Sequence, residues 1–438
     1  GVVLFARLFD AISDPIIGYL SDKGRIKWGT RKPYMTVGAI VLVVAGYFLY
    51  SPPDNVGVLY FAFWFMVFYL GFTLFEIPHL AWGGEISRST HEKTQAYTAR
   101  AVTGYLGSVL FYVIPLLPIW ESTEVTPETL KFSAVVSGLL MLPMLYLCMK
   151  RVPDGSCYSE IKKSVDSSDR PTPAAFFRRF PELVKNIIRN KPLMLFLGAF
   201  VFAGSGLGMW TGLLFIYMDA YLGMGSLYVK ILLTSTLLVI IPGILVWPKI
   251  AKHLGKKYAW LLAMLLSVVA FIYSGFLSSE SASYWTLLIL LMAALLSFIC
   301  FESLPQSMLS DIIDYSALKF GTYQGSTYFA LFMFIYKAAA ALGVAFGLAI
   351  VGWSGFDPSS TAQTELGIRG LKLAMTWVPT LLIAISMIFI ALSPITARRH
   401  RIIYRRLESI EARSKLESRK FERLDFDKSA TETLLTSH

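Results

Sequence analysis

Residues 56–75 read VGVLYFAFWFMVFYLGFTLF, a stretch without a single charged side chain. A helix of about 20 apolar residues crosses a hydrocarbon core about 30 Å thick. Only helices and closed barrels can span that core, because every backbone polar group must find its partner within the protein. A barrel strand would alternate apolar and polar residues, and this stretch does not. It therefore predicts a transmembrane helix.

The rest of the chain repeats this pattern. Of its 438 residues 55% are hydrophobic and 16% are charged, and further uncharged runs occupy 34–50 and 381–392. Soluble domains carry about 25% charged residues. Cys148, Cys157 and Cys300 have neither a disulfide-type nor a metal-type spacing. We expect an all-helical protein that crosses the lipid bilayer many times.

The basic residues gather in short segments between the apolar runs, so the net charge of +11 does not indicate a nucleic-acid partner. The basic segments are 21–33, 88–100, 151–191, 252–257 and 397–428. The alternating connections, which hold few basic residues, are 51–55, 121–131, 222–226, 279–281 and 355–370. Basic loops remain in the cytoplasm, so we expect a cytoplasmic C-terminus and a bacterial-type inner membrane. The weakly basic connection 311–325 fits this alternation poorly.

Eleven helices are expected, at roughly 1–21, 34–51, 56–82, 97–120, 132–150, 193–220, 227–250, 258–278, 283–310, 326–353 and 371–394. Secondary transporters are often built from two six-helix halves, so the simplest interpretation is that one N-terminal helix is missing from this sequence. The expected parts are an N-terminal half at 1–150 (helices 2–6), a cytoplasmic linker at 151–191, a C-terminal half at 192–396 (helices 7–12) and a cytoplasmic tail at 397–438. The basic and acidic residues of the tail predict an amphipathic helix on the membrane surface.

Three charges lie within the first predicted helix: Arg7, Asp10 and Asp14. Asp10 and Asp14 are four residues apart, so they share one helix face with Cβ atoms about 5–6 Å apart. Two such carboxylates cannot both stay ionised in a membrane unless a proton or a metal cation joins them. Hard cations prefer oxygen ligands. The pair predicts a cation site, and a structural Arg7–Asp10 salt bridge is the alternative.

Other charges interrupt later apolar helices. Thr73 and Glu76 precede Pro78, which removes a backbone hydrogen bond and kinks the helix. Glu302 lies in another apolar run, and Lys337 lies about eleven residues inside its helix, too far for its ammonium group to reach water easily. Charges inside a membrane are functional candidates by default. We predict that Glu76, Glu302 and Lys337 contact a polar solute, with structural ion pairs as the alternative.

Further charges mark the helix ends on the basic side. Asp22, Arg25 and Arg31 follow the first predicted helix, and Asp311 and Asp314 close a later one. We interpret them as gate or loop-pairing residues. The sequence contains no phosphate-binding loop, no zinc-protease motif and no nucleophile elbow. We therefore expect a carrier that an ion gradient drives, with no enzymatic activity, no cofactor and no use of ATP.

Five stretches support a more specific interpretation. They are FARLFDAISDPIIG at 5–18, WGTRKP at 28–33, EIP at 76–78, the 92–100 segment, and DIIDY at 311–315 with the following 325–337. Together they resemble the glycoside–pentoside–hexuronide:cation symporters of the major facilitator superfamily. The resemblance covers nearly the whole chain except the tail. It implies two six-helix bundles, with the family's first helix absent from this sequence.

The resemblance also implies a coupling-cation site. Its ligands would be Asp10, Ser13, Asp14 and Thr73, and the coupling cation would be Na⁺, Li⁺ or H⁺. If the carrier is sodium-coupled, Asp10, Asp14 and Thr73 would hold the metal ion.

On the solute side, the resemblance implies that Glu76 binds sugar hydroxyls, with Arg100 and Lys337 close by. Glu76 replaces a family aspartate, Leu80 stands where a tryptophan is found in the family, and Glu302 falls near another such tryptophan. Stacking of a sugar ring on indole is therefore not expected, and the substrate need not be a galactoside.

The function predicted from the sequence is symport of a sugar or glycoside with a monovalent cation, by alternating access. One alternative is a proton-coupled carrier of a non-sugar amphiphile or drug. Another is a membrane sensor that keeps the fold but transports nothing.

Overall fold

All regular structure in the described part of the chain is helical. The computed structural model describes residues 2–53, 55–87, 89–120, 125–154, 173–224, 231–232, 235–236, 242–278, 282–321, 323–357, 363–394, 396, 399–403 and 405–409. The first helices are α1 (Val2–Trp28), α2 (Lys32–Tyr50), α3 (Val58–Glu85), α4 (Thr90–Val113), η1 (Ile114–Leu116) and α5 (Pro127–Arg151). The later ones are α6 (Pro173–Arg189), α7 (Lys191–Ile216), η3 (Tyr217–Tyr221), α9 (Val246–Leu254), α10 (Lys256–Gly275), α11 (Tyr284–Phe301), α12 (Leu304–Phe320), α13 (Gly325–Trp353), α14 (Glu365–Lys372), η4 (Leu373–Trp377) and α15 (Val378–Ala391).

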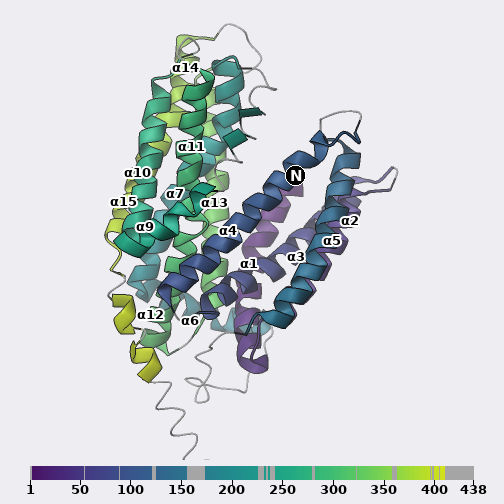
Figure 1. Cartoon of the computed structure of the whole chain (residues 1–438), viewed down its shortest axis with the longest axis vertical. Coiled ribbons are helices and arrows are strands. Elements are labelled where there is room, and N and C mark those ends of the chain that lie inside the picture. The colour runs from purple at the N-terminus through teal and green to yellow at the C-terminus, as the bar shows by residue number, and fades with distance from the viewer. Residues whose placement is uncertain are drawn as a thin grey trace, which may run out of the picture.

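These helices form two bundles that lie side by side in Figure 1, with α1–α5 in one and α7–α15 in the other. Nine helical segments of the described residues are long and apolar enough to cross a membrane. The helix α1 has the length as well, 27 residues, but Arg7, Asp10 and Asp14 lie within it. Of the predicted helix at 227–250, residues 227–230, 233–234 and 237–241 lie outside the described residues, and its last residues belong to α9. The protein is an all-helical, multi-pass membrane protein, as the sequence predicted.

The connections at the basic side are shorter than predicted. The helix α1 continues past the predicted end at residue 21 to Trp28, and it stops at Gly29, whose φ of 73° suits glycine. Likewise α12 continues through Asp311 and Asp314 and ends at Gly321, which has φ 65°. The predicted loops 21–33 and 311–325 were wrong in these parts, because Asp22, Arg25, Asp311 and Asp314 have partners inside the protein.

The predicted continuous helix at 283–310 is broken into α11 and α12. Glu302 is the C-cap of α11, and Pro305 lies in the first turn of α12. A proline has no N–H group to donate, and its ring clashes with the carbonyl four residues earlier, here that of Phe301. The break places the Glu302 side chain at a helix end within the bundle.

The predicted linker at 151–191 contains a helix that the sequence analysis missed, α6 (Pro173–Arg189). In the predicted tail, residues 399–403 and 405–409 are helical. The remainder of the predicted tail helix lies outside the described residues.

The second bundle is held by close helix packing. A side chain at Gly343 of α13 would run into the backbone of Ser205 on α7, and one at Gly208 of α7 would run into the backbone of Ala340. Lipid tails are as apolar as the helices, so the hydrophobic effect does not bring membrane helices together. Small residues let the helices approach closely, and van der Waals contacts then stabilise the pair. This rigid α7–α13 pair fixes the position of Lys337, which projects from α13 toward the first bundle.

Candidate functional site

The two bundles meet most tightly at the end where α1 finishes, the lower end of Figure 1. There Asp22 of α1 accepts hydrogen bonds from the backbone N–H groups of Ser326 and Thr327, each at 2.8 Å. These two residues form the first turn of α13, whose own N-cap, Gln324, makes no side-chain capping bond. A carboxylate at a helix N-terminus satisfies free N–H groups and suits the helix dipole. The first bundle thus caps a helix of the second.

Arg31 completes this arrangement from beside Asp22. Its guanidinium group donates to Asp22 at 2.8 Å and to Glu85 at 3.0 and 2.8 Å, and Glu85 also accepts from Arg25 at 3.0 Å. Burial alone would lower the pKa of Arg31, but Glu85 and Asp22 raise it above its ordinary value, so the cation stays charged. We call Asp22, Arg25, Arg31 and Glu85 the Arg31 network. The sequence predicted its first three members and missed Glu85.

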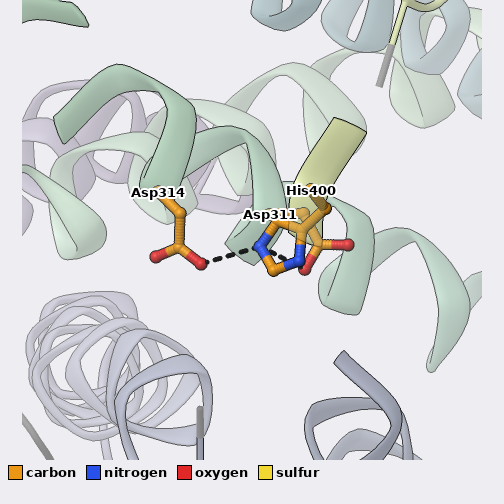
Figure 2. A group of neighbouring side chains, drawn as sticks. All are labelled: Asp311, Asp314 and His400. Atoms are coloured by element: carbon orange, nitrogen blue, oxygen red, sulfur yellow. Dashed lines mark hydrogen bonds and ion pairs between the residues drawn. The ribbon is translucent and has the colours of Figure 1, made fainter. Parts of the chain in front are cut away.

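A second buried cluster lies beside the Arg31 network. Lys93 of α4 donates to Asp314 at 2.7 Å across the two bundles, and Lys256 donates to Asp311 at 2.8 Å. Figure 2 shows the imidazole of His400 between the two carboxylates, with Nε2 3.0 Å from Asp314 Oδ2 and 3.4 Å from Asp311 Oδ1. We call these five residues the Asp311–Asp314 cluster. The two aspartates were predicted as gate residues, and their three partners were not.

The same cluster offers three donors for a metal ion, because Asp311, Asp314 and His400 hold ligand atoms within 4.8 Å of one another. Its charges already balance, since the two ammonium groups of Lys93 and Lys256 face two carboxylates. A divalent ion would have to displace or repel both lysines. The geometry therefore supports a structural lock more than a metal site.

Midway along α1, a third group contains the predicted cation ligands. Asp14 is fully buried and accepts hydrogen bonds from Thr73 Oγ1 at 2.8 Å and from Lys337 Nζ at 3.0 Å. The hydroxyl of Ser13 is buried and finds no hydrogen-bond partner among the described residues. We call Ser13, Asp14, Thr73 and Lys337 the Asp14 site. The side chain of Asp10 lies outside the described residues, so its place in the site stays a prediction.

A fourth group joins the bundles near the α11–α12 break. Arg100 of α4 donates to Glu76 of α3, and its other nitrogen lies 3.4 Å from Gln306 Oε1 and 3.7 Å from Glu302 Oε2. The Glu302 and Arg100 side chains are 39% and 24% exposed, so water reaches the group. We call these four residues the Arg100 network. Gln306 was not among the predicted solute ligands.

The structure brings the Asp14 site and the Arg100 network within one helical turn of each other. Thr73 and Glu76 both lie on α3, three residues apart, which is a rise of about 4.5 Å along the axis. Lys337 was predicted to contact the solute, with an ion pair as the alternative, and in the structure its ammonium group lies 3.0 Å from Asp14. Leu80 is fully buried, and the hydroxyl of Tyr97 donates to its carbonyl, so its side chain is closed off from water.

Comparison with known proteins places this architecture in a family. The MFS/sugar transport protein family matches residues 1–397. The uncharacterized symporter YjmB of Bacillus subtilis is 27% identical over 411 residues, which is 91% of this chain and 84% of that protein. The inner membrane symporter YicJ of Escherichia coli is 25% identical over 392 residues, 88% of this chain and 81% of that protein.

Two further similarities are more distant. The sodium-dependent lysophosphatidylcholine symporter 1 of Homo sapiens is 22% identical over 434 residues, 91% of this chain and 77% of that protein. Among solved structures, the fucose:proton symporter FucP of E. coli aligns with a TM-score of 0.57 at 14% identity, covering 90% of this chain and 98% of that chain. The last likeness concerns the fold alone. Together with the family match, these findings show that the chain belongs to the MFS/sugar transport protein family, among the glycoside–pentoside–hexuronide:cation symporter-like members of the major facilitator superfamily.

Proposed function

We propose that the protein carries a sugar or glycoside across a bacterial-type inner membrane together with a monovalent cation, by alternating access. One observation carries this proposal: the ammonium group of Lys337, from the second bundle, lies 3.0 Å from the buried carboxylate of Asp14 in the first. A positive charge thus occupies the place that a coupling cation would take.

Lys337 and the cation compete for Asp14 in this mechanism. A Na⁺ or Li⁺ ion would take oxygens from Asp14, Thr73 and Ser13, with Asp10 as the ligand that the family resemblance adds. A proton would instead neutralise Asp14. Either cation weakens the Lys337–Asp14 attraction and frees the lysine for the solute. The cation gradient can drive transport because the cation binds more tightly when Lys337 is away from Asp14 than when the two are paired.

The solute would enter the Arg100 network. The carboxylates of Glu76 and Glu302 can accept hydrogen bonds from hydroxyl groups, and the amide of Gln306 can both accept and donate them. Arg100 offers several donors in a fixed plane. Without solute these groups bond to one another, which avoids an unpaired charge inside the membrane. Because Arg100 reaches both bundles, a solute bound here would contact both halves.

The lower end of Figure 1, where α1 finishes, would be the cytoplasmic side in this proposal, since α1 ends within the basic segment 21–33. The structure then represents a carrier closed to the cytoplasm by the Arg31 network and the Asp311–Asp314 cluster. A cysteine at Lys27 should be labelled only from the cytoplasm and one at Asn55 only from outside. The reverse labelling would overturn this orientation and the cytoplasmic C-terminus.

The function is tested by uptake into proteoliposomes of a panel of labelled glycosides, with Na⁺, Li⁺ or proton gradients imposed separately. At least one glycoside should accumulate above its outside concentration with one of the cations. Binding without accumulation would indicate a sensor. No binding and no accumulation of any glycoside would contradict the sugar assignment.

A second candidate is a carrier of non-sugar amphiphiles, and the similarity to a sodium-dependent lysophosphatidylcholine symporter favours it. The same vesicles distinguish the two functions. An amphiphile carrier would take up a labelled lysophospholipid, and excess glycoside would not compete with it.

A further inference from the structure

A cavity of about 540 Å³ lies beside the Asp311–Asp314 cluster, and no step of the proposed transport uses it. Its walls come from three parts of the chain. Thr90 and His91 belong to the start of α4, Lys252 belongs to α9, and Arg401 and Arg405 belong to the helical segment after the last transmembrane helix. The cavity therefore lies between the first bundle and the second.

The wall of the cavity has an excess of positive charge. Lys252, Arg401 and Arg405 make no ion pair with any carboxylate among the described residues. Of the described residues that line the cavity, Glu408 alone carries a carboxylate. The three cations repel one another because they line the same cavity, and an anion bound between them would remove that repulsion.

The His400 contacts fix two of these cations in place. His400 is buried, and it contacts Thr90 of α4 through Nδ1 at 2.6 Å and Asp314 of α12 through Nε2 at 3.0 Å. This anchor holds the segment that carries Arg401 and Arg405 against the gate. Both arginines line the cavity from that segment. The buried imidazole of His400 thus ties this part of the cavity wall to the closed end.

The chemistry of the wall suits a phosphate group. Arginine presents a planar fork of donors that matches phosphate oxygens in two bonds at once. The first turn of α4 adds to this, because Ser89 provides no side-chain cap and the N–H groups of Thr90 and His91 have no acceptor within the helix. A volume of about 540 Å³ has room for a phosphate ester and not only for a bare ion.

We infer that this cavity binds a phosphate monoester, supplied either by a soluble metabolite or by a lipid headgroup, and that the bound phosphate holds the two bundles together at this end. A ligand that contacts α4 on one side and Lys252, Arg401 and Arg405 on the other must lose half of its contacts when the bundles separate. Its binding therefore favours the conformation seen here. This site would be an inhibitory one for a carrier that must open here to complete its cycle.

The binding test uses the full chain in phosphatidylcholine nanodiscs, with two probes that separate the sources. Labelled glycerol 3-phosphate represents the soluble ester, and phosphatidic acid added to the nanodisc represents the lipid. Saturable binding of at least one probe is expected, and the double variant Arg401→Ala/Arg405→Ala should bind it about tenfold more weakly or worse. Lys252→Ala, on a different element, should weaken it as well.

The matched control is Arg406→Ala, an exposed arginine of the same segment that does not line the cavity. It should bind the probe within about twofold of the unchanged protein. Binding of glycerol 3-phosphate would identify a soluble ligand, and binding of phosphatidic acid alone would identify a lipid. If neither probe binds, or if Arg406→Ala weakens binding as much as the double variant, the inference is wrong.

Closure is measured separately, with spin labels at Lys27→Cys and Lys249→Cys, two exposed positions on different bundles at this end. The native cysteines are replaced first. The bound probe should increase the population with the shorter label separation, and it should not do so in the Arg401→Ala/Arg405→Ala background. A distance distribution that saturating probe leaves unchanged would overturn the bridging role. Neither assay needs transport, so failure of the proposed function would leave both results intact.

Discussion

The closed end of the protein and its middle both contain charges inside the membrane region, but they use them differently. At the closed end every charged residue of the Arg31 network has several close partners. Asp22, for example, accepts hydrogen bonds from Arg31, Ser326 and Thr327. In the middle, the hydroxyl of Ser13 has no partner among the described residues, and Asp14 is bound to a lysine that another ion could replace. Charges that already have several close partners hold the two bundles together, whereas a charge whose partner can be exchanged suits a binding site.

This contrast predicts the largest effect on stability at Glu85. Glu85→Ala would remove the carboxylate that the two buried cations Arg25 and Arg31 share, and among the described residues Arg31 would keep Asp22 as its ion-pair partner. Removing one partner of a buried ion pair costs about 3–5 kcal/mol. The free energy of unfolding in detergent should fall by about that amount. The control is Glu365→Ala, whose pair with Arg369 is fully accessible to water, and it should leave stability unchanged. Equal effects of the two variants would remove the distinction between lock and surface pair.

The next largest effect is on transport, at Asp14. Asp14→Asn keeps the shape of the side chain and its bond with Thr73, but it removes the charge that a coupling cation needs. The variant should fail to accumulate solute against a gradient, while exchange of solute down its gradient survives. Uptake with an imposed ion gradient measures the first, and counterflow measures the second. Concentrative uptake at the level of the unchanged protein would show that Asp14 does not couple the two fluxes.

A smaller effect is expected at Glu76, which belongs to the Arg100 network. A hydrogen bond to a charged group contributes about 1.5–3 kcal/mol, so Glu76→Gln should weaken solute binding by about 10- to 100-fold. The free energy of unfolding should change much less than in Glu85→Ala, since Arg100 keeps Glu302 as a partner. Calorimetric titration with the transported solute measures the affinity. An unchanged affinity would remove Glu76 from the solute site.

The smallest effect is expected at Ser13. Since its hydroxyl has no partner among the described residues, Ser13→Ala should leave the free energy of unfolding unchanged or slightly higher. The affinity for the coupling cation should nevertheless fall by about fivefold, because the site loses one neutral oxygen that contributes about 1 kcal/mol to cation binding. A loss of stability without a loss of cation affinity would assign Ser13 to the lock rather than to the binding site.

The middle of the protein could be predicted from the sequence better than its closed end. Asp14, Thr73, Glu76 and Lys337 were recognised because a charge or hydroxyl inside an apolar run has few explanations. The sequence did not decide which acid Lys337 would contact, since Asp14 is 323 positions away and only the fold brings the two side chains together.

At the closed end the hydropathy pattern was misleading. Charges near helix ends are typical of solvated loops, so Asp22 and Asp311 were placed at helix ends beside loops. Glu85, Lys93 and His400 were assigned no individual role. The structure shows helices that continue through these residues because each charge finds a partner across the bundle interface. Lys93 meets Asp314 over 221 positions, a pairing that no local pattern encodes.

The central claim is that Lys337 and the coupling cation compete for Asp14. It is tested most directly by the affinity of the purified protein for Na⁺, Li⁺ and H⁺ without solute, compared between the unchanged protein and Lys337→Ala. Removing the competing ammonium group should tighten binding of the coupling cation by about tenfold, since a buried carboxylate that has lost its ammonium partner gains more from a cation. The double variant Lys337→Ala/Asp14→Asn should lose that gain. Binding of all three cations that is unchanged or weaker in Lys337→Ala would contradict the account.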